Sequence, residues 1–80
     1  MTSPEIYRAL KEIFSEVFLR DDIQLKPQLS ARDVHGWDSL RQVEIVIAAE
    51  ERFGIRLTSR EIARLACLGD LVALIQAKKH

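Results

Sequence analysis

The sequence contains little cysteine, proline, glycine or aromatic residue. Its 80 residues include one cysteine (Cys67), two prolines and three glycines, and aromatic residues make up only 6%. A lone thiol excludes an internal disulfide and a cysteine-rich zinc site, and it is typical of a reducing compartment. Because aromatic residues are scarce, Leu, Ile, Val and Ala must fill the interior. Hydrophobic residues at 48% suffice for one core, and we expect residues 1–80 to form a single small domain.

The chain also lacks an excess of charge of either sign. Its 12 basic residues balance 12 acidic residues, and no basic stripe indicates a nucleic-acid surface. No apolar run approaches the roughly 18 residues that a membrane span needs. The first residues have neither the basic nor the apolar region of a signal peptide. These absences predict a soluble, cytoplasmic protein that binds no nucleic acid and does not insert into a membrane. We also expect the protein to be a monomer.

Apolar residues recur at helical spacing in two long segments. Ser3 and Pro4 suit the N-cap and first position of a helix over about 4–19. A second helix is predicted over about 39–53. Gly54 suits the position just after the C-terminus of that helix, because glycine adopts the left-handed conformation at no steric cost.

A short helix and a final helix complete the pattern. Thr58 or Ser59 caps the short helix, and Glu61 lies at the capping-box distance from Thr58. The final helix begins near Leu68, with Cys67 at its N-cap. The sequence therefore predicts an all-α fold, a small four-helix bundle of three longer helices and one short one.

The segment 20–37, between the first two helices, has no clear period. Pro27 cannot lie inside a helix, and Gly36 interrupts the end of the segment. Ordered loops of this length are often functional. Trp37 is expected to pack the end of the loop against the following helix, and the alternative is that it contacts a partner. The apolar residues of the loop are expected to fix it to the core: Ile23, Leu25, Leu29 and Val34.

The helix over 39–53 carries two apolar stripes. A core stripe consists of Ile45, Val46, Ala49 and Phe53, and an outer stripe consists of Leu40, Val43 and Ile47. A helix in so small a bundle can hardly bury both stripes, so we expect the outer stripe to be partly exposed. Exposed apolar residues with a charged rim are typical of a docking surface, here with Arg41, Glu44, Glu51 and Arg52 as the rim. The alternative is that the long loop covers the outer stripe.

Ser39 lies where the loop becomes this helix. Serine and aspartate at a helix start are by themselves ordinary capping residues, although the free N–H groups there also favour a phosphate. The surrounding sequence is more specific: Gly36-Trp37-Asp38-Ser39-Leu40, then Val43-Glu44-Ile45-Val46, Glu50-Glu51-Arg52-Phe53-Gly54-Ile55 and Leu68-Gly69-Asp70-Leu71. Over about residues 6–77 the chain resembles the acyl carrier protein family.

The resemblance implies a carrier and not an enzyme, with no catalytic residue and no metal site of its own. Ser39 would receive 4′-phosphopantetheine from coenzyme A by the action of a separate, magnesium-dependent phosphopantetheinyl transferase. Asp38 would help to bind that transferase and its metal, and Leu40 would contact partners. The thiol of the arm, not Cys67, would hold the acyl group as a thioester. Further partners would be acyl-loading, condensing or acyl-transfer enzymes.

The charge of the chain departs from the pattern of fatty-acid carriers, many of which are strongly acidic. Arg41 and Arg52 occupy positions that are often neutral or acidic in those carriers. Their partners present basic surfaces, onto which a near-neutral carrier should dock poorly. We therefore expect a dedicated partner set, in polyketide, hybrid peptide or other specialised acyl or aminoacyl biosynthesis.

Three other classes of protein compete with a carrier. A helical interaction module without a prosthetic group would explain the outer stripe but not the placement of Asp38-Ser39-Leu40. A DNA-binding domain is disfavoured by the absence of net positive charge. A small enzyme is disfavoured because two histidines and one cysteine are too few for the usual catalytic constellations.

Overall fold

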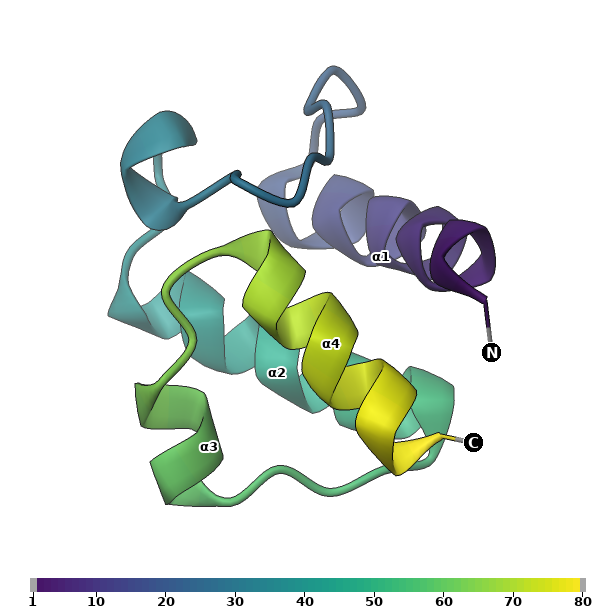
Figure 1. The fold of residues 1–80 in the computed structure, drawn as a ribbon. Helices are drawn as coiled ribbons and strands as arrows, with labels where there is room; N and C mark the ends of the chain where they lie inside the picture. The colour runs from purple at the N-terminus through teal and green to yellow at the C-terminus, as the bar shows by residue number, and fades with distance from the viewer. Residues whose placement is uncertain (1, 80) are drawn as a thin grey trace.

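The computed structural model describes residues 2–79; Met1 and His80, which belong to the expected single domain, lie outside the described residues. The described part is all-α. Its elements are α1 (Ser3–Phe18), the 3₁₀ turn η1 (Ala31–Asp33), α2 (Ser39–Phe53), α3 (Ser59–Ala63) and α4 (Leu68–Lys78). Helix α1 packs against both α2 and α4. The short α3 lies in the connection that leads from α2 to α4 (Figure 1). The prediction of three longer helices and one short one is confirmed.

The boundaries of the helices follow from their capping residues, with one correction. Thr2, not Ser3, is the N-cap of α1, because Thr2 and Glu5 form the capping box. The Thr2 Oγ1 accepts a hydrogen bond from the Glu5 N–H (3.4 Å), and the Glu5 carboxylate accepts one from the Thr2 hydroxyl (2.8 Å). Helix α2 begins and ends as predicted, and Gly54 follows it with a φ of 66°.

The capping of the last two helices is also as the sequence indicates. Thr58 and Glu61 form the capping box of α3, which decides between Thr58 and Ser59. Cys67 is the N-cap residue of α4, and the Asp70 carboxylate accepts hydrogen bonds from the N–H groups of Ala66 (3.0 Å) and Cys67 (3.3 Å). The Ala66 N–H, followed by the Cys67 N–H, lowers the pKa of Asp70. The charged carboxylate therefore holds the link between α3 and α4 at neutral pH.

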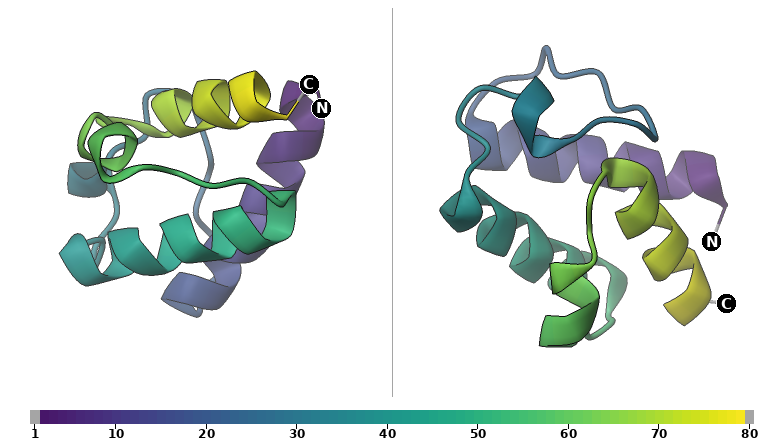
Figure 2. Two further views of the ribbon diagram at one scale, coloured as in Figure 1. Left: turned by 90° about the horizontal axis from the view of Figure 1, so that it is seen from below. Right: turned by 60° about the vertical axis from the view of Figure 1, so that its left-hand side comes forward.

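The loop over 19–38 crosses the bundle above α1 and reaches the start of α4 (Figure 2). Three of its apolar residues, Ile23, Leu29 and Val34, are buried in the core, and Leu25 packs against it. The prediction that these residues fix the loop is confirmed. The η1 turn was not predicted, because its few residues have no period that a sequence pattern could reveal.

Backbone hydrogen bonds join the loop to the N-terminus of α4. The carbonyl of Leu29 accepts from the Leu68 N–H (2.7 Å), and that of Pro27 accepts from the Gly69 N–H (2.8 Å). Two N–H groups that would lack a partner within α4 are thereby satisfied. A Cβ atom on Gly69 would lie 2.9 Å from the Pro27 carbonyl oxygen, so only glycine allows this approach.

We expect Gly69→Ala to destabilise the protein by about 1–3 kcal/mol, because the added methyl group must displace backbone. Helix propensity alone would give the opposite sign, since alanine is about 1 kcal/mol better than glycine in a helix. Urea unfolding of both proteins measures the difference. A variant as stable as the wild type, or more stable, would contradict the close approach of the loop to α4.

Candidate functional site

The site is the junction of the loop and α2, where Ser39 is the first helical residue. The N-cap is Asp38, whose Oδ1 accepts a hydrogen bond from the Arg41 N–H (2.9 Å). Ser39 is exposed, and within residues 2–79 its hydroxyl has no hydrogen-bond partner. The serine therefore does not cap the helix, and its Oγ is free to react.

The electrostatics of the junction suit a phosphate ester. The first N–H groups of α2 have no partner within the helix, and together with the helix dipole they favour negative charge nearby. Asp38 supplies one such charge and leaves its Oδ2 without a partner in the described part of the chain. An exposed hydroxyl at the start of a helix thus fits a phosphodiester-linked group.

A tight turn and an aromatic contact hold the junction in place. Gly36 has a φ of 90°, which favours glycine, and its carbonyl accepts from the Asp38 N–H (3.1 Å). The Trp37 Nε1–H donates to Gln42 Oε1 (2.7 Å). The Trp37 ring packs edge-on against Phe14 of α1, with ring centroids 5.3 Å apart. The predicted packing of Trp37 toward α2 is confirmed, but its ring contacts lie on α1, and no sequence signal identified Gln42.

The two apolar stripes of α2 differ in burial as predicted. Every residue of the core stripe is buried. The outer stripe remains exposed, by 63% at Leu40, 51% at Val43 and 49% at Ile47. The alternative that the loop covers the outer stripe is therefore wrong. Because Leu40 follows Ser39 directly, the exposed apolar surface begins beside the free hydroxyl.

Charged side chains flank the outer stripe on the same helix. Arg41 forms an ion pair with Glu44. Arg52 forms an ion pair with Glu12 of α1 (3.0 Å), which holds it on the side of α2 that faces α1. Glu51 is exposed. All four residues of the proposed rim thus lie on α2. Among them, Arg52 is the one whose side chain is paired with a residue of another helix.

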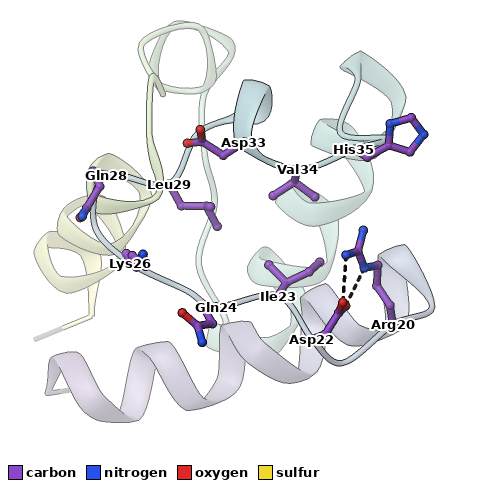
Figure 3. Close-up of a pocket in the computed structure, with 10 residues that line it drawn as sticks. All are labelled: Arg20, Asp22, Ile23, Gln24, Lys26, Gln28, Leu29, Asp33, Val34 and His35. Atoms are coloured by element: carbon purple, nitrogen blue, oxygen red, sulfur yellow. Dashed lines mark hydrogen bonds and ion pairs between the residues drawn. The ribbon is translucent and has the colours of Figure 1, made fainter.

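A cleft of about 600 Å³ is lined by residues of the loop and does not include Ser39 (Figure 3). The Arg20 Nε–H donates to Asp22 Oδ1 (2.7 Å), and this contact lowers the pKa of Asp22. No group of three or more potential metal ligands occurs in the described part of the chain. Likewise, none of the helices described here is long and apolar enough to cross a membrane.

Comparisons with known proteins identify the family of the chain. The family model described as "Phosphopantetheine attachment site" matches residues 8–75. The acyl carrier protein of Acidothermus cellulolyticus is 39% identical over 75 residues, covering 94% of this chain and 89% of the relative. The meromycolate extension acyl carrier protein of Mycolicibacterium smegmatis is 36% identical, covering 94% and 76%.

A solved structure shows the same fold. The solution structure of holo acyl carrier protein from Geobacter metallireducens superposes with a TM-score of 0.83 at 35% identity, covering 89% of this chain and 82% of that one. Proteins of this kind are non-catalytic: they carry acyl groups on 4′-phosphopantetheine and are acted on by a phosphopantetheinyl transferase and by acyl-handling enzymes. The chain belongs to the acyl carrier proteins of the phosphopantetheine-attachment family.

Proposed function

We propose that Ser39 is the residue that bears 4′-phosphopantetheine. The observation that carries this assignment is the exposed hydroxyl at the first position of α2, which is free because Asp38 provides the cap. Ser39 Oγ attacks the pantetheine-side phosphorus of coenzyme A, the pyrophosphate bond breaks so that adenosine 3′,5′-bisphosphate leaves, and the serine proton passes to the transferase. The arm supplies the thiol on which acyl groups are held as thioesters.

The other residues of the junction position this hydroxyl. Asp38 fixes the first turn of α2 through its Oδ1, and its Oδ2 is available to the transferase and its magnesium ion. Gly36 and Trp37 fix the path by which the loop enters the helix. Cys67 lies half-buried at the start of α4 and is not needed as a cargo thiol. These contacts support a carrier in which a rigid helix start presents Ser39 to other enzymes.

The outer stripe is the proposed docking surface. Leu40, Val43 and Ile47 are exposed in one row next to Ser39, and Arg41, Glu44, Glu51 and Arg52 provide charge around it. A surface of this composition suits transient contacts with acyl-loading, condensing or acyl-transfer enzymes. The protein functions as a cytoplasmic monomer, with residues 1–80 as one carrier domain.

The charge of the chain supports a dedicated set of partners. A carrier that docks onto basic surfaces needs an acidic docking helix. Arg41 and Arg52 reduce the negative charge of α2, and the chain as a whole is neutral. The cargo is therefore assigned to a specialised acyl or aminoacyl pathway, such as polyketide or hybrid peptide synthesis.

Incubation with coenzyme A and a broad-specificity phosphopantetheinyl transferase tests the carrier function. The intact mass is expected to rise by one phosphopantetheine group. A helical interaction module without a prosthetic group would keep its original mass. Circular dichroism of the same sample checks that the protein is folded, so a missing increment would count against the function itself.

We expect removal of the two arginine charges, in Arg41→Gln/Arg52→Gln, to raise the initial rate of loading by a fatty-acid malonyl transferase at low salt. Glutamine is used because a glutamate at position 52 would face Glu12. The advantage should shrink in salt, because the screening length is only about 10 Å at 0.1 M.

The matched control is Arg8→Gln/Arg32→Gln, which removes the same charge from exposed positions on α1 and η1. Its loading rate should change less than that of the α2 variant. Equal rates for the two variants would show that net charge, and not charge on α2, governs the encounter. If neither variant loaded faster than the wild type, the assignment to a dedicated partner set would lose its support.

A further inference from the structure

The surface of α3 carries positive charge that the fold does not neutralise. Arg60 of α3 and Arg64 at its C-cap are exposed, and neither side chain has a hydrogen-bond or ion-pair partner within residues 2–79. The neighbouring carboxylate, Glu61, is already engaged through both oxygens. Its Oε1 accepts from the Thr58 N–H (2.9 Å), and its Oε2 pairs with Lys78 Nζ of α4 (3.1 Å).

The two arginines work against the local fold. They lie four residues apart, so their side chains are neighbours on the helix surface, and like charges at this spacing destabilise a helix. Helix α3 has only five residues and therefore little stability of its own. The pair is thus explained by attraction to a negatively charged partner and not by a contribution to the stability of α3.

An open groove of about 420 Å³ lies between α3 and α4, and Arg64 is one of the residues that line it. On α4, Ala73 and Ala77 are exposed and lie one turn apart, so no long side chain keeps another molecule away from that helix. Neither Ser39 nor any residue of the outer stripe lines the groove. Its apolar lining consists of Leu65, Ala73, Leu74 and Ala77.

The free charge of the groove is positive. Two carboxylates also line it, but both are engaged within the protein. Glu61 is held as described above, and the Asp70 Oδ2 accepts from two backbone N–H groups at the start of α4. Arg64 is the one charged residue of the lining without a partner in the described part of the chain. The groove therefore combines an apolar lining with an unneutralised arginine at its edge.

We propose that the α3–α4 groove is a second docking surface, for a helix of a partner protein that presents apolar side chains flanked by carboxylates. Arginine binds carboxylates through two parallel hydrogen bonds, and apolar side chains gain by burial against Leu65 and Leu74. An amphipathic helix in a groove supplies both contacts at once. The inference goes beyond the carrier function and does not depend on Ser39, because the two surfaces share no residue.

The probe is a synthetic amphipathic peptide with leucines along one helical face and glutamates on either side of them. Its binding to the 80-residue chain is followed at low salt by NMR titration of the backbone amides. The signals of Leu65, Ala73 and Ala77 should shift, and those of Val43 and Ile47 on the outer stripe should not. The same peptide with lysine in place of glutamate should cause no shifts, and neither should vesicles of anionic phospholipid.

Two variants test the two parts of the surface. Arg60→Gln/Arg64→Gln should weaken binding of the glutamate peptide by at least about tenfold, because the charge-assisted contacts are lost. Its stability in urea should not fall, because the like-charge repulsion is relieved. Ala73→Gln fills the groove with a good helix former and should also weaken binding. The matched control is Arg8→Gln/Arg32→Gln, which removes the same charge elsewhere and should bind the peptide nearly as the wild type does.

The proposal is overturned if the glutamate peptide does not bind, or if its shifts are confined to the outer stripe. Equal weakening in the α3 variant and the control would also overturn it, because net charge would then govern binding. Binding of the vesicles and not of the peptide would assign the arginines to a lipid surface instead. A loss of stability in Arg60→Gln/Arg64→Gln would show that the arginines serve the fold. Failure of loading at Ser39 would leave these results unchanged, since the titration needs no prosthetic group.

Discussion

Replacing Ile45 or Phe53 with alanine is expected to destabilise the protein severely, whereas Ile47→Ala should have little effect. Ile45 is 1% exposed and Phe53 2% exposed, while Ile47 lies two residues after Ile45 on the other face of α2. Removing a buried isoleucine costs about 2–5 kcal/mol and a buried phenylalanine about 3–5 kcal/mol. Ile47 is already half in water, so its truncation should cost less than about 1 kcal/mol.

The comparison of Ile45→Ala with Ile47→Ala is well matched, because both changes remove the same atoms from the same helix. A domain of this size has a total stability of only roughly 4–12 kcal/mol, so the core variants should unfold at a much lower urea concentration. Ile47→Ala should instead slow acyl transfer from a partner enzyme. Equal losses of stability in the two isoleucine variants would contradict the division of α2 into a core stripe and an outer stripe.

Replacing Ser39 with alanine is expected to abolish loading altogether. The variant lacks Ser39 Oγ, the atom of this protein that forms the new bond in the proposed reaction. It should remain folded, because Asp38 and not Ser39 caps α2, and surface substitutions usually change stability by less than about 0.5 kcal/mol. Intact mass after incubation with coenzyme A and a transferase measures loading, and circular dichroism measures helix content.

Ser59→Ala is the matched control. Ser59 is likewise exposed, is the first residue of a helix and follows its N-cap, Thr58. Loading of this variant should equal that of the wild type. If Ser39→Ala still gained the phosphopantetheine mass, the attachment residue would have to be sought elsewhere in the chain.

Local signals in the sequence predicted the elements whose ends are determined by their own residues. Gly54 marks the end of α2 because few other residues adopt its left-handed conformation readily. The Thr58–Glu61 spacing marks the start of α3 because the two side chains satisfy each other's backbone. The same spacing in Thr2–Glu5 marks the start of α1, one residue before the position that the serine–proline pair indicates.

Features that depend on distant segments could not be predicted in this way. Nothing in the sequence around Gly69 indicates that the Pro27 carbonyl approaches it, because the two are brought together only by the fold. The Trp37–Gln42 bond is local, but tryptophan and glutamine have no fixed spacing that would identify it. The burial of the loop was predictable from its apolar residues, whereas its path above α1 to the start of α4 was not.

The most direct test of the account is to find the modified residue by peptide mass spectrometry. Trypsin cleavage after Arg32 and Arg41 releases residues 33–41, in which Ser39 is the only hydroxyl-bearing side chain. After incubation with coenzyme A and a transferase, the phosphopantetheine increment should appear on this peptide and on no other. An unmodified 33–41 peptide, or an increment on any other peptide, would contradict the assignment of Ser39 as the residue that carries the acyl group.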